Sequence, residues 1–136
     1  MKTEIQTITR SLVSGRQRIQ FLQCYFGARL MMRGESLVYD WMSNLSRDYR
    51  GGSWQFYTLS NGGFYMAPAI DEPLNIVCAG NSYNGKLSAD AAGIVANLYA
   101  LCRLAETEDR IVDRYHYLRD FALSHSEARK IMRAID

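Results

Sequence analysis

Residues 54–68 have the sequence WQFYTLSNGGFYMAP, and this stretch decides the fold. Its first half is rich in aromatic side chains, which favour β-strands because they pack well on a pleated surface. The pair Asn61-Gly62 tolerates the positive φ angles that a tight hairpin turn requires. Residues 64–67 return as a second strand, and Pro68 ends the ladder because it has no N–H to donate. The stretch therefore predicts an antiparallel β-hairpin.

The chain after the hairpin continues with strands and then with helices. Residues 74–79 form a third predicted strand, and residues 82–87 form a fourth, short one. No helix separates these strands, which favours an antiparallel meander over β-α-β crossovers. Ser88 is a good N-cap for the helix predicted at 89–105, where apolar and small side chains recur at helical spacing. We expect a further helix at 108–123.

Helices are also predicted at both ends of the chain. Ser124 and Glu127 have the spacing of a capping box, which predicts that Ser124 opens a last helix ending near Ile135. Before the hairpin, apolar residues at helical spacing predict helices at 15–26 and 34–45. The strands are thus flanked by helices on both sides in the sequence.

These elements predict one α+β domain that spans residues 1–136. A small antiparallel sheet of three to four strands, arranged as a meander, is covered by helices from the N- and C-terminal parts of the chain. A chain of this length suits a single domain with one hydrophobic core. We expect residues 1–12 to be flexible or loosely packed against that domain.

The charge balance excludes one class of DNA-directed inhibitor. The chain has 16 basic and 14 acidic side chains, a net charge of +2. An inhibitor that imitates DNA needs a dense negative surface, because duplex DNA carries about one charge per 1.7 Å of its axis. DNA mimicry is therefore excluded. Most of the basic residues are arginines, which we expect in surface ion pairs with carboxylates.

Few side chains carry catalytic or metal-binding chemistry. We predict that Cys24, Cys78 and Cys102 are buried reduced thiols, since they form no C-x-x-C pair. His116 is expected on an exposed helix face and His125 in the first turn of a helix. Nucleotide-binding, hydrolase and zinc-site motifs do not occur in the sequence. The sequence therefore predicts a protein without catalytic residues, cofactor or metal, and not an enzyme.

The sequence also predicts where the protein works. Its N-terminus has no apolar signal-peptide region, and no apolar run reaches the ~18 residues that span a bilayer. We expect a cytoplasmic, monomeric protein without membrane contact.

Aromatic residues are concentrated around the predicted sheet. Rings interleaved with arginines can stack single-stranded bases, which would make this a nucleic-acid-binding surface. Strand alternation, however, directs half of the rings into the core, which favours a core or a protein interface. The residues concerned are Trp54, Phe56, Tyr57, Phe64, Tyr65 and Tyr83.

Several blocks together resemble the ArdB/KlcA antirestriction family, and their order and spacing hold from about residue 16 to the end of the chain. The chain departs from the family pattern at Gln23-Cys24, where Pro-Arg is expected, so one positive charge and one helix-perturbing proline are missing. The blocks are FLQCYFG (21–27), RGESLVYDWM (33–42), GGSWQFY (51–57), LSNGGFYMAP (59–68), LSADAAGIV (87–95) and YLRDFA (117–122).

The resemblance implies a protein of plasmids or other mobile DNA that protects incoming unmodified DNA from type I restriction-modification systems. It brings no catalytic residues. The leading hypothesis is a non-enzymatic inhibitor that contacts the restriction complex or a host factor on which the complex depends. The alternative is a nucleic-acid-binding module that uses the N-terminal arginines and the sheet aromatics, although direct DNA binding is not what we expect.

Candidate contact residues lie at the hairpin turn and at the start of the 89–105 helix. Loop tips on rigid scaffolds often carry recognition. The same residues also have structural roles, because Asn-Gly-Gly makes a turn and an aspartate favours a helix start. The candidates are Asn61, Gly62, Gly63, Tyr65 and Asp90.

Overall fold

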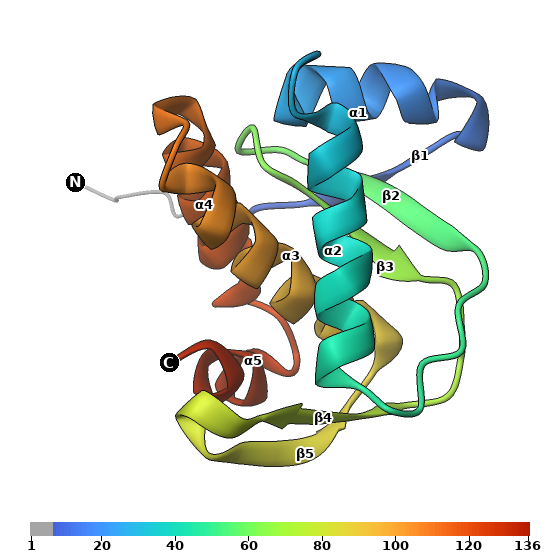
Figure 1. Ribbon diagram of the computed structural model, residues 1–136, viewed down its shortest axis with the longest axis vertical. Coiled ribbons are helices and arrows are strands. Elements are labelled where there is room, and N and C mark those ends of the chain that lie inside the picture. Colours follow the sequence, from blue (N-terminus) through green and yellow to red (C-terminus); the bar gives the residue numbers. More distant parts are fainter. Residues whose placement is uncertain (1–6) are drawn as a thin grey trace.

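The computed structural model describes residues 7–136, in which five α-helices accompany two small antiparallel sheets (Figure 1). None of the described helices is both long enough and apolar enough to cross a lipid bilayer. The elements are β1 (Arg10–Val13), the 3-10 turn η1 (Gly15–Gln17), α1 (Arg18–Phe26), α2 (Met31–Leu45), β2 (Trp54–Leu59), β3 (Phe64–Pro68), β4 (Leu74–Cys78), the 3-10 turn η2 (Ala79–Asn81), β5 (Tyr83–Leu87), α3 (Ala89–Ala105), α4 (Asp109–Ala122) and α5 (Ala128–Ile135).

The predicted hairpin is confirmed. Strands β2 and β3 pair antiparallel, with Thr58 opposite Phe64 at the turn and Trp54 opposite Pro68 at the open end. Gly62 has a φ of 95°, a left-handed conformation that glycine adopts without the strain of a side chain. All five residues of β3 are buried, so this strand runs through the interior of the molecule.

A strand that the sequence did not predict extends the hairpin. β1 pairs antiparallel with β2, from Arg10 opposite Leu59 to Val13 opposite Phe56. Within the segment 1–12, which we expected to be flexible or loosely packed, the residues from Arg10 onward thus belong to a strand, and residues 1–6 lie outside the described part. β1 is short and mostly exposed, so no apolar alternation marks it as a strand in the sequence.

The predicted α+β class with a small antiparallel sheet of three to four strands is confirmed, and the strands are divided between two sheets. Strands β1, β2 and β3 form one sheet, and β4 and β5 form a separate hairpin. The cause is helix α3, which lies along the outer edge of β3. There the buried amide of Asn97 donates to the carbonyl oxygen of Met66 (2.7 Å) and accepts from its N–H (3.2 Å). The side chain thus takes the place of a neighbouring strand.

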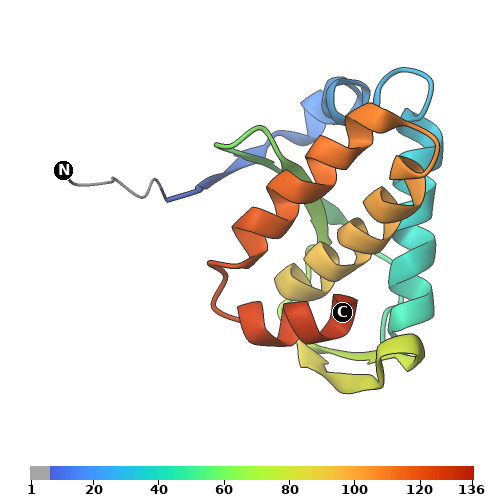
Figure 2. The same ribbon diagram turned by 90° about the vertical axis from the view of Figure 1, so that its left-hand side faces the viewer.

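Helix α3 forms the centre of the core, with the bounds that the sequence predicted. It packs against α2, α4, α5 and β3, and Figure 2 shows α3 lying between α2 and α4. Small residues allow this close approach. A Cβ added at Gly93 would lie 2.6 Å from the Cβ of Ala67 and 2.9 Å from the carbonyl oxygen of Met66. The helix and β3 are therefore nearly in backbone contact.

The last helix begins later than predicted. α5 starts at Ala128, and Ser124 does not cap it. The carboxylate of Glu127 instead accepts hydrogen bonds from the backbone N–H (3.0 Å) and the hydroxyl of Ser88. A tertiary contact has therefore replaced the local capping box. This contact also brings the start of α5 to the start of α3.

Candidate functional site

Asp90 lies in the first turn of α3, where the sequence placed it. Ser88 caps this helix, and its hydroxyl oxygen accepts a hydrogen bond from the N–H of Ala91 at 3.1 Å. The unpaired N–H groups of a helix start favour a negative charge, so the backbone itself prepares this position for a carboxylate.

Three segments far apart in the sequence converge on that carboxylate. Arg10 of β1 lies with Nη1 2.6 Å from Oδ1 of Asp90, and the hydroxyl of Tyr65 donates to the same oxygen at 2.9 Å. His125, from the segment before α5, lies with Nε2 2.9 Å from Oδ2. The Arg10 guanidinium also donates to the Tyr65 hydroxyl oxygen at 2.5 Å and lies 4.3 Å above the ring of Tyr57. We call Arg10, Tyr65, Asp90 and His125 the Asp90 cluster.

The cluster favours an ionised Asp90. Burial by itself would raise the pKa of this carboxyl, but the hydrogen bonds from His125 and Tyr65 and the charge of Arg10 outweigh it, so the pKa is lowered. Burial raises the pKa of Tyr65 well above its ordinary value, and the charge of Asp90 raises it further. Asp90 is therefore a fixed negative charge next to a fixed neutral phenol.

The nitrogens of His125 are both in use. The backbone N–H of Glu127 donates to Nδ1 at 3.0 Å, so the neutral ring carries its hydrogen on Nε2 and donates it to Asp90. The hydroxyl of Ser88 is likewise occupied, because it caps α3 and donates to Glu127. Serine, histidine and aspartate thus lie near one another without a hydrogen bond from the serine to the histidine. The Asp90 cluster joins β1, β3, α3 and the residues before α5.

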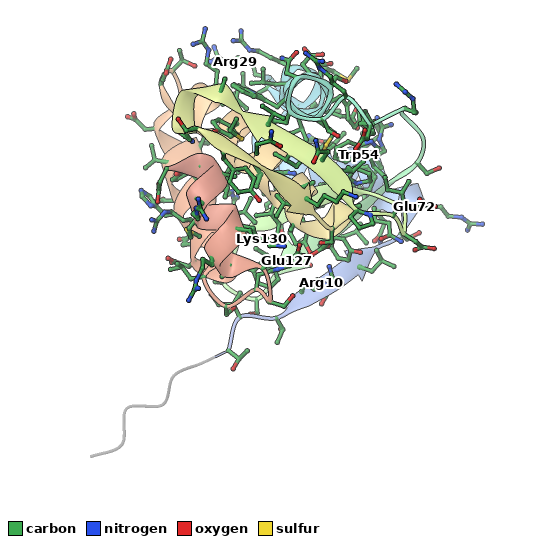
Figure 3. The ribbon with its side chains drawn as sticks, turned by 90° about the horizontal axis from the view of Figure 1, so that it is seen from below. Arg10, Arg29, Trp54, Glu72, Glu127 and Lys130 are labelled. Atoms are coloured by element: carbon green, nitrogen blue, oxygen red, sulfur yellow. The ribbon has the colours of Figure 1, made fainter. Side chains whose placement is uncertain are left out.

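A hollow of about 240 Å³ lies beside the cluster. Its walls come from residues 67–71 on one side and from Arg10, Gln55, Tyr57 and Asp90 on the other. Figure 3, viewed from below, shows Arg10 of β1 and Glu127, the residue before α5, on the same side of the molecule. Among residues 7–136, no three histidine, cysteine, aspartate or glutamate side chains lie close enough together to hold a metal ion. The hollow is thus a polar surface feature.

The hairpin turn is fixed to helix α4. Asn61 donates from its amide to the carbonyl oxygen of Tyr117 at 2.9 Å and accepts from the N–H of Gly63 at 3.0 Å. Arg114 donates to the carbonyl oxygen of Gly62 at 2.7 Å. The turn is therefore a rigid element.

The five candidate contact residues fall into two neighbouring groups. Asn61, Gly62 and Gly63 form the turn, while Tyr65 and Asp90 belong to the Asp90 cluster. The turn and β1 are joined where the N–H of Ser60 donates to the carbonyl oxygen of Thr9 at 2.9 Å. Tyr65 is completely buried and Asp90 keeps 28% of its side chain exposed. Any contact made by the cluster therefore comes from Asp90 or Arg10.

Sequence reasoning missed Arg10 and the role of His125. Arg10 lies in the strand that no pattern indicated, and it is 80 positions away from its partner Asp90. His125 was expected in the first turn of a helix, but it lies in the segment before α5 and is mostly buried. His116 is exposed on α4, as predicted. Only the tertiary fold brings the cluster together.

A second polar group, which the sequence did not indicate, lies between α1 and α2. Glu35 is buried and pairs with Arg18 of α1, which donates from Nε at 2.8 Å. The Tyr39 hydroxyl also donates to Glu35 at 3.1 Å, and burial together with the charge of Glu35 raises the pKa of Tyr39 to about 12. The ring of Tyr39 packs edge-on against Trp54, 4.9 Å between centroids. This half-buried ion pair joins α1 to α2, and Tyr39 connects it to the sheet.

The sheet aromatics do not form an exposed stacking surface in the described part of the chain. Trp54 is half-buried, and its indole N–H donates to the hydroxyl of Tyr49 at 2.8 Å. The other rings belong to the core, as the alternation argument favoured: Phe56, Tyr57, Phe64, Tyr65 and Tyr83. Their burial removes the main support for the nucleic-acid-binding alternative.

The cysteines differ from the prediction in part. Cys78 is buried, and burial raises the pKa of its thiol. Cys24 and Cys102 are exposed, so the prediction of buried thiols is wrong for these two. Each lies on the outer side of its helix, a difference that apolar periodicity did not resolve.

The fold and the Asp90 cluster define a small α+β protein with a rigid polar surface, and comparison with known proteins gives its class. The family model "Antirestriction protein" matches residues 47–136. An antirestriction protein KlcA of Escherichia coli is 54% identical over the full length of both chains. The uncharacterized protein YafX of Escherichia coli K12 is 40% identical, covering 95% of this chain and 88% of its own.

A solved structure agrees with these sequence matches. It is 55% identical, covers both chains completely and superposes with a TM-score of 0.88. It comes from a study of KlcA and ArdB that describes a novel fold and antirestriction activity against type I DNA restriction systems in vivo but not in vitro. The present chain therefore belongs to the antirestriction protein family, and the resemblance to ArdB and KlcA is confirmed.

Proposed function

We propose that this protein protects incoming unmodified plasmid or other mobile-element DNA from type I restriction-modification systems in the cytoplasm. The observation that carries the proposal is the full-length match to KlcA and ArdB, for which antirestriction activity in vivo is described. At 55% identity and a TM-score of 0.88, this chain can present the same surfaces as those proteins.

The test is a restriction assay in cells. Unmodified phage or plasmid DNA is introduced into a host with a type I system, with and without the protein, and into a host without that system. We expect the yield in the restricting host to rise toward that in the non-restricting host only when the protein is present. Equal restriction with and without the folded protein would contradict the proposal.

We infer that the protein does not act by imitating DNA. Its net charge is +2, and several of its acids are neutralised within the fold. Glu35 pairs with Arg18, Glu108 with Arg29 and Asp90 with Arg10. A DNA mimic instead needs unpaired acids at the spacing of phosphates.

We also infer a non-enzymatic action through protein contacts. Ser88 and His125, the nearest approach to a catalytic arrangement, are both held in structural hydrogen bonds. The partner is the restriction complex or a host factor on which it depends. The activity described for KlcA and ArdB in vivo but not in vitro favours the host factor, because a cellular component would be missing from a purified assay.

We propose that the contact surface is the side that carries the Asp90 cluster, its hollow and the hairpin turn. Asp71 is exposed and lines the hollow, so Asp71→Arg would change the charge and shape of this surface without touching the core. We expect this variant to lose protection while keeping the melting temperature of the wild type. The matched control is Asp40→Arg on the exposed side of α2. If the Asp71→Arg variant protected DNA as well as the Asp40→Arg variant, the proposed contact surface would be contradicted.

A further inference from the structure

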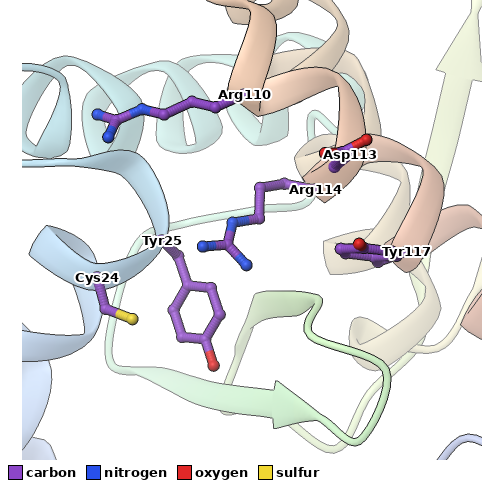
Figure 4. Close-up of a pocket in the computed structure, with 6 residues that line it drawn as sticks. All are labelled: Cys24, Tyr25, Arg110, Asp113, Arg114 and Tyr117. Atoms are coloured by element: carbon purple, nitrogen blue, oxygen red, sulfur yellow. The ribbon is translucent and has the colours of Figure 1, made fainter.

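A pocket of about 220 Å³ lies where α1 and α4 meet, next to the hairpin turn (Figure 4). Cys24 and Tyr25 of α1 line one side, and four residues of α4 line the other: Arg110, Asp113, Arg114 and Tyr117. The spacing of the four brings them to one face of the helix. The pocket thus combines two guanidinium groups, two phenol rings, one carboxylate and one thiol.

Arg114 is held in place without a carboxylate partner among residues 7–136. It is half-buried, its Nη1 donates to the carbonyl oxygen of Gly62 at 2.7 Å, and its Cζ lies 4.9 Å above the ring of Tyr25. Tyr25 is itself fixed by stacking on Phe64, 4.8 Å between centroids. In the described part of the chain, Arg114 forms no ion pair. A half-buried guanidinium with free N–H groups favours an anion, because partial burial of a charge costs free energy that an opposite charge offsets.

Arg110 extends in the same direction from α4. Its Nη2 donates to the carbonyl oxygen of Phe26 at 3.3 Å, at the end of α1, while its Nε lies 3.7 Å from the carboxylate of Glu108, which also pairs with Arg29. Gly27 makes this position possible, since a Cβ there would lie 1.6 Å from Nη2 of Arg110. Figure 4 shows both guanidinium groups reaching toward α1, whereas the Asp113 carboxylate lies back beside Tyr117. The positive groups therefore lie together on the α1 side of the pocket.

We propose that this pocket binds a single oxyanion, the phosphate or carboxylate group of a small ligand. A planar guanidinium offers paired N–H donors that match such an oxyanion, and both arginines are already positioned by the protein. The cavity volume suits one such group with a short stem. The carboxylate of Asp113 at its edge disfavours a polyanion with many closely spaced charges. This inference does not depend on the proposed antirestriction activity.

The test uses inorganic phosphate and acetate as separate probes, at constant ionic strength, with backbone amide chemical shifts as the readout. We expect saturable shifts at Gly27, Gly62 and the residues of α4 that line the pocket. Saturation by phosphate alone would assign the site to phosphoryl groups, and saturation by acetate would assign it to carboxylates. Shifts that do not saturate with either probe would overturn the proposal.

Charge substitutions at the exposed Cys24 test the site without disturbing the arginines. Cys24→Glu should weaken binding by about threefold and Cys24→Lys should strengthen it by about threefold, as expected for a partly exposed charge pair. The exposed Cys102 of α3 provides matched controls, Cys102→Glu and Cys102→Lys, which should leave the affinity unchanged. If the Cys24 and Cys102 variants behave alike, the anion is only screening the overall charge and the site does not exist.

Discussion

The amide of Asn97 on α3 occupies both hydrogen-bonding groups of Met66 on β3, and it also donates to the carbonyl oxygen of Gly93 at 2.5 Å. Asn97 and Met66 are both fully buried. A strand edge inside a protein needs a partner for each N–H and C=O group. Asn97 meets that need at Met66, in the middle of β3, on the side where no further strand pairs with β3.

Asn97→Ala should destabilise the protein by about 3 kcal/mol, because it leaves the N–H and C=O of Met66 buried without partners. Asn97→Asp should cost more at pH 7, since a carboxylate cannot donate to the carbonyl oxygen and would be buried with its charge. Urea unfolding gives these free energies. Asn44→Ala on the exposed side of α2 should change stability by less than about 0.5 kcal/mol. A similar loss for Asn44 and Asn97 would contradict the role given to Asn97.

Gly93→Ala should destabilise the fold by about 2 kcal/mol, although alanine favours a helix more than glycine does. The added Cβ would meet Ala67 at 2.6 Å, and both the helix and the strand are fixed by the core. Gly80→Ala is the control, because nothing lies within 4 Å of a Cβ added there. Thermal unfolding should separate the two variants. A stabilised Gly93→Ala variant would mean that α3 and β3 can move apart freely.

The Asp90 cluster makes stability depend on pH. The pKa of Asp90 is lower in the folded protein than its ordinary value of 3.8, so its contribution is fully present above that value. The contribution is lost as the pH falls through the folded pKa, because protonation then favours the unfolded chain. Asp90→Asn should cost about 2 kcal/mol at pH 7, and the difference from the wild type should shrink below pH 4.

Unfolding in urea at pH 7 and at pH 3 measures this difference, with Asp40→Asn as a control for acids in general. Asp40 is exposed on α2, so its substitution should have the same small effect at both values. A difference between Asp90→Asn and the wild type that grows toward low pH would have the opposite sign and would refute the arrangement.

The thiols should react in two classes. Cys24 and Cys102 are exposed, whereas Cys78 is buried and burial raises the pKa of its thiol. Since the thiolate is the reactive form, a disulfide reagent should modify two thiols of the native protein rapidly and the third only after unfolding. In Cys78→Ala, the native count should stay at two and the unfolded count should fall to two. Three rapid thiols in the native wild type would mean that the β4–β5 hairpin opens readily.

Much of the fold could be predicted from local sequence. Asn61-Gly62 and the aromatic strands gave the hairpin, and Ser88 with its apolar stripe gave both ends of α3. These features are determined by neighbours in the chain. The boundary at which the sheet divides could not be predicted, because it depends on Asn97, a residue 31 positions away from Met66 that looks like an ordinary polar helix residue.

For the candidate site, the sequence predicted only the roles that depend on neighbouring residues in the chain. Asp90 was recognised as a helix-start residue and Asn61 as a turn residue, and both have those roles. Arg10, His125 and Glu127 could not be assigned, because their partners are 35 to 80 positions away. Glu127 shows the limit well, since its spacing to Ser124 indicated a local capping box, whereas its carboxylate bonds instead to Ser88, 39 positions away.

Because α3 and its Asn97 cover the outer edge of β3, a further strand could join the three-stranded sheet only at its other edge. On the opposite side, β1 pairs with β2 alone among the described strands, and its Leu12 is 63% exposed. Open strand edges are where chains add to one another in domain swapping and fibril formation. If copies of this protein add to one another through a strand edge, β1 is the edge that the described part of the chain leaves available. Affinity tags and fusion partners are accordingly better placed at the C-terminus, away from that edge.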